Sequence, residues 1–449
     1  MPIFTRLLST NDIGEFSNMT SWIGILCIVA TFELFSTIGV ARYDFKGELD
    51  DYMASNLLLG TTITLIFYLI CLTFKEAFLS FFSFTELELH VTFMYLLVYP
   101  ALQMFQSRKQ IQYEYKMSVL LSLLSVLSAT GLSLICVLTF SNKLLGRILG
   151  YYVPLIVINL CIYIYILLKA KRISARYWKY ALRIAAPLIV HLLAGNLLNS
   201  SDRVMINSMR GSSEAAMYTV AYSCGIIVQV LWQSMNTAWS PWAYEMMSKK
   251  NYTAMRKASK PYILFFGFVS LGFMLIGPEV LLIMGGEAYL EATGVILPVL
   301  AAYVFQFTYS LYVNIEFYYK KQHYIAIGTI IAAVVNIVLN YIFIPKFGYV
   351  AAAYTTLIGY IVLFLIHYGF THLMGLNQIY DTKFIMGFLL AFLAIMFAGI
   401  ELYKHNTIRY VLIAILFLAV VIAMVVFRKE VIYAIKKKSF DKFHERFRR

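Results

Sequence analysis

Long apolar segments recur along this chain, and they constrain its fold more than any other feature. A helix of about 20 apolar residues crosses a hydrocarbon core of about 30 Å. Hydrophobic residues make up 61% of the 449 residues and charged residues only 13%, too few polar residues to cover a soluble globule. Backbone groups in lipid must bond one another, and apolar runs without alternation favour helices over a barrel. We therefore predict an all-α polytopic membrane protein.

Thirteen spans are predicted from these runs. They cover residues 19–41, 55–74, 88–107, 117–140, 148–168, 182–209, 214–243, 261–284, 292–318, 323–344, 349–371, 384–403 and 409–427. Two of these spans, 182–209 and 214–243, are long for a helix that stands perpendicular to the membrane. We expect each of them to tilt or to include a turn outside the membrane.

The distribution of Lys and Arg predicts the orientation. When residues 1–18 are placed outside, the cytoplasmic loops and the C-terminal tail together contain 28 of the 37 Lys and Arg residues, and the other side contains 9. Positively charged loops stay in the cytoplasm, so we expect a cytoplasmic C-terminus. The net charge of +14 and the basic tail 436–449 suit contact with anionic lipid better than contact with nucleic acid.

Several function classes leave no sign in the sequence. We find no glycine-rich phosphate loop and no nucleotide signature, so we expect no cofactor and no ATP hydrolysis. The five cysteines lie inside apolar spans without the spacing of metal ligands, so we expect no metal site.

Polar residues inside two neighbouring spans are the functional candidates. On a helical wheel, one arc of about 140° in span 182–209 contains five polar side chains. They are His191, Asn196, Asn199, Asp202 and Arg203. In span 214–243 a narrower stripe runs the whole length and consists of Tyr218, Tyr222, Gln229, Gln233, Asn236 and Ser240. Two such faces on neighbouring spans predict one polar wall of a water-filled cavity. Hydrogen bonding between helices of a dry bundle is the alternative.

Ionisable residues at membrane depth leave further alternatives open. Glu33 is the only acid in the middle of span 19–41, and it is either a protonated, hydrogen-bonded carboxyl or part of a cavity. Asp202 and Arg203 either face the cavity or form an ion pair near the outer interface. Glu279 follows Gly277-Pro278, which indicates a helix break with a polar contact.

The first residues suggest that a preceding helix is missing. Residues 2–8 look like the last turns of a helix, and residues 11–14 look like a turn. With this segment outside, a helix that ends there should come up from the cytoplasm. We therefore expect a missing first span, which would bring the complete design to fourteen.

Several short motifs resemble those of Wzx-like polysaccharide flippases, in the multidrug/oligosaccharidyl-lipid/polysaccharide superfamily. The stretch Thr5-Arg6-Leu7-Leu8-Ser9, followed by Asp12, Gly14 and Phe16, resembles the motif that closes the first helix of that family. Further matches, in the family's order and spacing, are Ser201-Asp202-Arg203-Val204-Met205-Ile206, Tyr218 to Tyr222, Ala238 to Trp242, Pro278-Glu279, Lys320-Lys321 and Ile344 to Ala353.

This resemblance implies a fold and its division into lobes. The expected fold is two six-helix lobes, the first helix being absent, plus two C-terminal helices, similar to MATE transporters and MurJ. By analogy the N-terminal lobe is 1–170, the C-terminal lobe is 171–375, and 376–449 contains two additional helices and a basic cytoplasmic tail.

The function that the resemblance implies is transport of a polyprenyl-pyrophosphate-linked oligosaccharide across the cytoplasmic membrane of a bacterium or archaeon. The product would enter surface polysaccharide, such as O-antigen of lipopolysaccharide, capsule or exopolysaccharide. No bond is made or broken, so we expect no enzyme. Expected partners are this substrate and membrane lipids, with a polysaccharide polymerase and chain-length proteins as further candidates.

The resemblance also suggests a role for each polar candidate. Arg6, Arg42 and Arg203 would bind the pyrophosphate through paired hydrogen bonds. The sugar contacts would come from Asn196, Asn199, Tyr218, Tyr222, Gln229, Gln233 and Asn236. Glu33 or Asp202 would carry a coupling proton.

Two rival functions remain open. A cation-coupled exporter of small organic molecules, as in MATE proteins, would share the superfamily fold. It should have acid-rich cavity faces, which Arg6 and Arg203 argue against. A membrane glycosyltransferase or polymerase would need large outside loops with catalytic acids, and the predicted outside loops are short.

Overall fold

The computed structural model describes residues 1–112 and 114–422, and this part of the chain is helical throughout, without strands. The first half contains α1 (Phe4–Leu7), α2 (Thr10–Thr31), η1 (Leu34–Thr37), α3 (Ile38–Asp44), α4 (Leu49–Thr73), α5 (Lys75–Phe82), α6 (Glu86–Ile111), α7 (Tyr115–Thr139) and α8 (Lys143–Lys169). The second half contains α9 (Ala175–Arg210), α10 (Ser212–Ser223), α11 (Ile226–Ser248), α12 (Tyr252–Leu275), α13 (Gly277–Gly285), η2 (Glu287–Ala292), α14 (Thr293–Tyr318), α15 (Gln322–Phe347), α16 (Tyr349–Leu373), α17 (Thr382–Leu402) and the helix Asn406–Ile422.

Most predicted spans correspond to helices of membrane-crossing length. In the described residues, nine helices are long and apolar enough to cross a membrane, or up to twelve if each bent pair of helices counts as one span. The helix Asn406–Ile422 is apolar but shorter, and it begins the last predicted span, 409–427. Residues 423–427 and the basic tail lie outside the described residues. The chain is therefore a multi-pass membrane protein, as predicted.

The start of the chain differs from the prediction. Residues 11–14 form no turn, because α2 already begins at Thr10. Ser9 caps this helix: its side chain accepts a hydrogen bond from the backbone of Asp12, and the Asp12 side chain bonds the backbone of Ser9 in return. Such a capping box satisfies two backbone groups at a helix start. The polar residues that resembled a turn are thus the first turn of a span.

The same span ends earlier than predicted. The prediction of one helix over 19–41 is wrong, because α2 stops at Thr31 and the chain continues through η1 and α3. Phe32 and Glu33 both have a left-handed backbone, with φ of 51° and 48°. That conformation costs a residue with a side chain roughly 1–2 kcal/mol, so the local sequence alone does not explain this break.

The two long predicted spans are bent. α9 bends by 47° between its segments Ala175–Ala186 and Leu188–Arg210. α10 and α11 meet at 45°. The predicted span 261–284 also divides, because α12 ends at Leu275 and α13 follows after a break at the Gly277-Pro278 pair. Each of the two long predicted spans is therefore a bent pair of helical segments.

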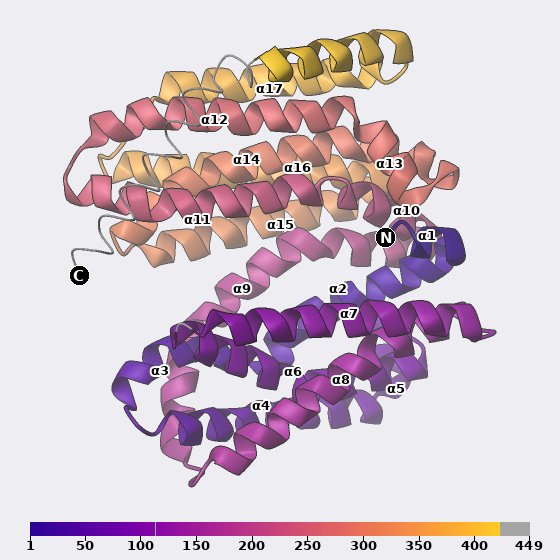
Figure 1. Cartoon of the computed structure of the whole chain (residues 1–449), viewed down its shortest axis with the longest axis vertical. Coiled ribbons are helices and arrows are strands. Elements are labelled where there is room, and N and C mark those ends of the chain that lie inside the picture. The colour runs from indigo at the N-terminus through magenta and orange to yellow at the C-terminus, as the bar shows by residue number, and fades with distance from the viewer. Residues whose placement is uncertain (113, 423–449) are drawn as a thin grey trace.

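Two helix bundles lie one above the other, and α9 passes from one to the other (Figure 1). Helices α2–α8 form the N-terminal lobe, and the second half of α9 together with α10 to residue 422 forms the C-terminal lobe (Figure 1). At its start α9 is bound to the N-terminal lobe: Tyr177 donates to Glu48 over 2.9 Å, and Trp178 donates to the backbone of Ser55 over 2.7 Å. Its second half packs against α15 and α10. The linker between α8 and α9, residues 170–174, therefore leads into a helix that both lobes share.

The lobes are joined at the end where α1, α10 and α13 gather, which we name the α1 end (Figure 1). Ser17 of α2 bonds Thr219 of α10 over 2.6 Å, and Thr5 donates to the backbone of Met284 over 2.7 Å. A Cβ on Gly14 would lie 1.7 Å from the backbone oxygen of Ser212, so only glycine allows this approach. Throughout the described chain, no hydrogen bond or ion pair joins α3–α8 to α10–α17. The structure is closed at one end of the interface between the lobes.

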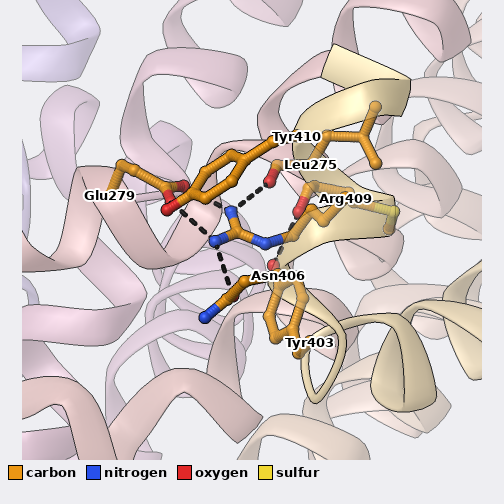
Figure 2. Close-up of polar contacts among 7 residues, drawn as sticks. Leu275, Glu279, Tyr403, Asn406, Arg409 and Tyr410 are labelled. Atoms are coloured by element: carbon orange, nitrogen blue, oxygen red, sulfur yellow. Dashed lines mark hydrogen bonds and ion pairs between the residues drawn. The ribbon is translucent and has the colours of Figure 1, made fainter.

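A buried arginine attaches the last described helix to the C-terminal lobe. Arg409 is 2% exposed and donates to both carboxylate oxygens of Glu279 over 2.5 and 2.6 Å, and to the backbone of Leu275 over 2.8 Å. The rings of Tyr403 and Tyr410 lie beside its guanidinium (Figure 2). The predicted polar contact of Glu279 at a helix break is thereby confirmed, with Arg409 as the partner.

Candidate substrate cavity between the lobes

A cavity of about 220 Å³ lies between the two lobes near the α1 end. Its walls come from α1, α2, α8, α9 and α10, so both lobes contribute. Its lining consists of Met1, Phe4, Leu8, Ile13, Phe16, Ser17, Thr20, Ser21, Arg147, Ser200, Arg203 and Thr219. Drug-sized ligands occupy sites of about 300–1,000 Å³, so this cavity has room for one group of a large ligand.

Arg147 of α8 is the cation that the N-terminal lobe contributes. Its guanidinium lies 3.7 Å from the ring centre of Phe4 and 4.3 Å from that of Phe16. One of its nitrogens donates to the hydroxyl of Ser133 over 2.8 Å. Aromatic faces attract a cation without neutralising its charge. Arg147 is thus held in place and keeps its full charge beside the cavity.

Arg203 of α9 is the corresponding cation of the C-terminal lobe. It lies 4.7 Å from the ring centre of Tyr222, and it donates to the backbone oxygen of Asn199 over 3.2 Å. Neither Arg203 nor Arg147 forms an ion pair with any residue that the structure describes. Two guanidinium groups that face one cavity suit an anion chemically, because each offers several N–H donors in a fixed plane.

Arg147 was missed because the predicted span began one residue after it. In the structure α8 begins at Lys143, so Arg147 is part of the helix. The available signal was the pair Gly146 and Gly150, four residues apart. Glycines at this spacing let membrane helices approach closely. A Cβ on Gly150 would lie 2.4 Å from the Cα of Ser133, so α7 and α8 are in backbone contact where Arg147 leaves the helix.

Asp202 faces away from the cavity, into the core of the C-terminal lobe. It is 1% exposed and accepts hydrogen bonds from Tyr218 over 2.6 Å, Asn340 over 2.6 Å and Thr356 over 2.5 Å. Its neighbour Arg203 points into the cavity and forms no ion pair with it in the described chain. The sequence left two alternatives for these residues: facing the cavity or pairing with each other. Arg203 faces the cavity, whereas Asp202 does neither.

The two asparagines of the predicted arc have different surroundings. Asn199 accepts a hydrogen bond from Tyr360 over 2.7 Å and donates to the backbone of Gly195, so both ends of its amide are occupied. The side-chain oxygen of Asn196 is buried without a hydrogen-bond partner in the described residues. A Cβ added to Gly24 of α2 would lie 3.5 Å from the side-chain nitrogen of Asn196, which is ordinary van der Waals contact. Asn196 thus lies at the contact of α9 with α2, outside the lining of the cavity.

The predicted stripe along 214–243 is not continuous, because the bend between α10 and α11 divides it. On α10, Tyr218 is fully buried and bonds Asp202, and Tyr222 is 5% exposed beneath Arg203. A helical wheel assumes a straight axis, so the tyrosines were wrongly placed on one surface with the α11 residues.

The α11 part of the stripe is more accessible. Gln229 is partly buried, and Gln233 is exposed. Asn236 accepts a hydrogen bond from Asn314 of α14 over 2.9 Å, so it connects two helices of one lobe. The glutamines are therefore the accessible portion of the stripe, whereas Asn236 fits the interhelical alternative.

Arg6 and Arg42 lie apart from the cavity. Arg6 is exposed at the α1 end and donates to the backbone of Pro2 and, over 3.4 Å, of Ile283. Arg42 donates to the backbone of Ile111 over 2.5 Å and lines a second pocket, together with Asp50 and Arg108. The structure therefore brings Arg203 together with Arg147, and not with Arg6 or Arg42.

Glu33 lies at the break between α2 and η1. It is partly exposed, and its carboxylate forms no hydrogen bond or ion pair within residues 1–112 and 114–422. Since its backbone also has a positive φ, Glu33 occupies a strained position.

A family model described as "Polysaccharide biosynthesis protein" matches residues 1–247, which is more than half of the chain. The chain belongs to this polysaccharide biosynthesis family. No curated protein matches the sequence. The family membership confirms the relationship that the short motifs indicated.

Solved transporter structures share the fold of this family member at low sequence identity. The lipid II flippase MurJ in an inward closed conformation is similar with a TM-score of 0.63 and 16% identity, over 94% of this chain and 98% of that chain. An inward-facing MATE multidrug transporter gives 0.61 at 14% identity, over 84% and 95%. An outward-facing MATE transporter gives 0.51 at 17% identity, over 84% and 90%. The predicted MATE- and MurJ-like fold is thereby confirmed.

Proposed function

We propose that this chain is a flippase that moves polyprenyl-pyrophosphate-linked oligosaccharide units from the cytoplasmic to the outer leaflet of the cytoplasmic membrane. The observation that supports the proposal is the cavity with one unpaired arginine from each lobe. Oxygens of a pyrophosphate accept paired, charge-assisted hydrogen bonds from guanidinium groups. Membership of a polysaccharide biosynthesis family is consistent with a saccharide as the attached group.

Transport would follow from movement of the lobes. A lipid tail can remain in hydrocarbon, whereas a saccharide and a pyrophosphate need a polar passage, which a rocking of two lobes can provide. A ligand bound to both Arg147 and Arg203 would bridge the lobes at the end where they already meet. Release would then require the contacts of Ser17 with Thr219 and of Gly14 with Ser212 to separate.

The orientation belongs to the same proposal. With the C-terminus cytoplasmic, as the Lys and Arg distribution predicts, the α1 end faces outward and the structure is closed on the outer side. Greater similarity to the inward-facing MATE structure, at 0.61, than to the outward-facing one, at 0.51, agrees with this arrangement.

The other predicted site residues take secondary places in the proposal. Asn196, Gln229 and Gln233 are the candidates for sugar contacts, since each keeps polar atoms available. Asp202 and Glu33 are candidates for binding a coupling ion. No bond is broken during such transport, so the chain acts as a transporter and not as an enzyme. A polymerase and chain-length proteins would use the exported units for O-antigen, capsule or exopolysaccharide.

Arginine substitutions in the host organism test the proposal. In a strain that lacks the chromosomal gene, plasmid copies with Arg147→Ala, Arg203→Ala or both should fail to restore surface polysaccharide, and lipid-linked precursor should accumulate. Loss of a buried charged contact costs about 2 kcal/mol or more, roughly thirtyfold in affinity. Lysine at either position keeps the charge but not the paired geometry, and should restore output only partly.

Arg172→Ala is the matched control, because Arg172 is exposed in the linker and its side chain makes no contact that the structure describes. It should behave as wild type. Normal polysaccharide with both cavity arginines replaced, at normal protein level, would refute the anion site. Unchanged precursor together with altered resistance to small organic cations would favour the exporter function.

A further inference from the structure

A buried acid–base pair lies in the C-terminal lobe, away from the substrate cavity. Glu316 of α14 and His367 of α16 are both 0% exposed. The Nδ1 atom of His367 lies 2.9 Å from both carboxylate oxygens of Glu316. Glu316 is two residues from the end of α14, and α16 ends six residues after His367, so the pair lies near the lobe end opposite to the α1 end. None of the polar residues chosen from the sequence belongs to it.

One atom of this pair has no partner. With Nδ1–H donated to the carboxylate, the second ring nitrogen of His367, Nε2, is the free basic atom. Nε2 is buried without a hydrogen-bond partner in the described chain. It points at Gly328 of α15, where a Cβ would lie only 2.8 Å away. A larger residue at 328 would crowd Nε2, so the glycine maintains space next to a nitrogen that can accept a proton.

Other titratable groups surround the pair. His323 at the start of α15 lies within electrostatic reach of Glu316, and His191 of α9 within reach of His367. The ring of Tyr309 on α14 lies 5.5 Å from that of His367. His191 also has a buried nitrogen without a partner, and it belongs to the helix that both lobes share. A chain of titratable groups thus extends from the end of α14 and α15 to α9.

The charge of the pair depends on a single proton. With Nε2 unprotonated, the pair has a charge of −1 from Glu316; with a proton on Nε2, His367 is cationic and the pair is neutral. A lone charge at membrane depth costs at least about 2.5–3.5 kcal/mol, whereas a bonded neutral pair is tolerated. Complete exclusion of water from both side chains therefore suits the protonated state.

We propose that Glu316 and His367 form a proton-binding site that couples proton movement to transport. The inference deepens the proposed function and rests on it for the transported substrate, but not for proton binding itself. In the dry arrangement of this structure the pair retains the proton and is neutral overall. A change in how α9 packs on α15 and α16 admits water to the pair, which stabilises the charge of −1 and releases the proton. Proton release and lobe movement are then one event.

The first test is proton uptake by the purified full chain in detergent, without saccharide, followed with a pH-sensitive dye in weakly buffered solution. Glu316→Gln and the double variant Glu316→Gln/His367→Gln should each bind about one proton fewer per chain than wild type as the solution is acidified. His372→Gln is the matched control, because His372 is exposed one turn further along α16. It should leave the proton that the buried pair binds in place.

The second test is transport in cells, scored as surface polysaccharide at equal protein level. Coupling between two bound ligands typically changes the binding affinity of each by about 5- to 150-fold. The transport rate of the double variant should therefore fall by a factor in that range. Glutamine side chains can still bond each other across the pair. A purely structural role would therefore leave the double variant near wild-type transport, and that result would overturn the proposal.

The two measurements separate this proposal from the flippase proposal. Normal proton uptake in the double variant overturns the proton site, whatever the substrate is. If uptake is reduced in the double variant but the protein proves to export a different substrate, the proton site stands. The flippase function is then overturned. Gly328→Ala adds a check that preserves both titratable residues. It should weaken proton binding, whereas Gly369→Ala, with nothing within 4 Å of its Cβ, should not.

Discussion

The two lobes differ in the charges that they enclose. The C-terminal lobe encloses Asp202, Glu316 and Arg409, and each has bonded partners on other helices. In the N-terminal lobe, Arg147 faces the cavity among aromatic rings, without a carboxylate partner in the described chain. An unpaired cation attracts an anion, whereas an enclosed acid suits a proton or a cation. The cavity arginines of both lobes thus suit substrate binding, whereas the enclosed acid–base pair of the C-terminal lobe suits ion coupling.

The largest expected effect concerns Asp202. Asp202→Ala leaves the donors of Tyr218, Asn340 and Thr356 without an acceptor, and each abandoned buried donor costs about 1–3 kcal/mol. Thermal unfolding of the purified protein should show a severe loss of stability. The matched change in the N-terminal lobe is Asn159→Ala, which removes a single bond to the backbone of Leu155. Equal losses in the two variants would erase the contrast between the lobes.

The next effect separates two buried arginines. Arg409→Leu leaves Glu279 without its partner and should lower the free energy of unfolding by about 1–3 kcal/mol. Arg147→Leu removes a charge that has no acidic partner, so stability should change little while transport is lost. The comparison requires melting curves and polysaccharide output for both variants. A strongly destabilised Arg147→Leu protein would mean that Arg147 is structural.

A smaller effect is expected where α7 and α8 meet. Gly150→Ala places a Cβ 2.4 Å from the Cα of Ser133, and such overpacking typically costs about 1–3 kcal/mol. The control is Gly131→Ala on α7, where no atom lies within 4 Å of the added Cβ. Alanine there should be neutral or stabilising by about 0.5–1 kcal/mol. Indistinguishable melting curves would show that close packing does not position Arg147.

The smallest effect concerns the start of α17. Lys260 bonds Asp381 over 2.7 Å and lowers the pKa of this carboxyl below its ordinary value. A lowered pKa in the folded state contributes stability above the unfolded value of about 3.9, and the contribution disappears as pH falls through the folded value. Asp381→Asn should therefore lower the melting temperature slightly at neutral pH, and not at all once Asp381 is protonated. A constant difference across that range would point to the helix cap instead.

The sequence predicted the helical segments well and their ends less well. Apolar runs report membrane depth, and that signal located nearly every span. A turn was wrongly predicted at residues 11–14 because a capping box and a turn use the same small polar residues. The break at Phe32 and Glu33 has no local signal, since no glycine or proline marks it and tertiary packing imposes the backbone.

The site was only partly predictable, because tertiary contacts also decide which side chains meet there. Arg203 could be found because it is a cation inside a span, but the wheel could not show that its neighbour Asp202 turns into the lobe. To predict Arg147, the exact start of α8 would have to be known. To predict the pairing of Glu316 with His367, one would have to know which helices are in contact. Those contacts join residues far apart in sequence, and a single sequence contains no direct record of them.

One measurement tests the central claim most directly. The purified chain is reconstituted into liposomes with lipid-linked oligosaccharide extracted from its host, and a membrane-impermeant oxidant reports how much saccharide faces outward. Wild-type protein should bring the inner-leaflet saccharide within reach of the oxidant, whereas the Arg147→Ala/Arg203→Ala protein should leave it protected, as in protein-free liposomes. If the double variant exposed the saccharide as fast as wild type, or if wild type exposed none under a proton gradient, the account would be contradicted.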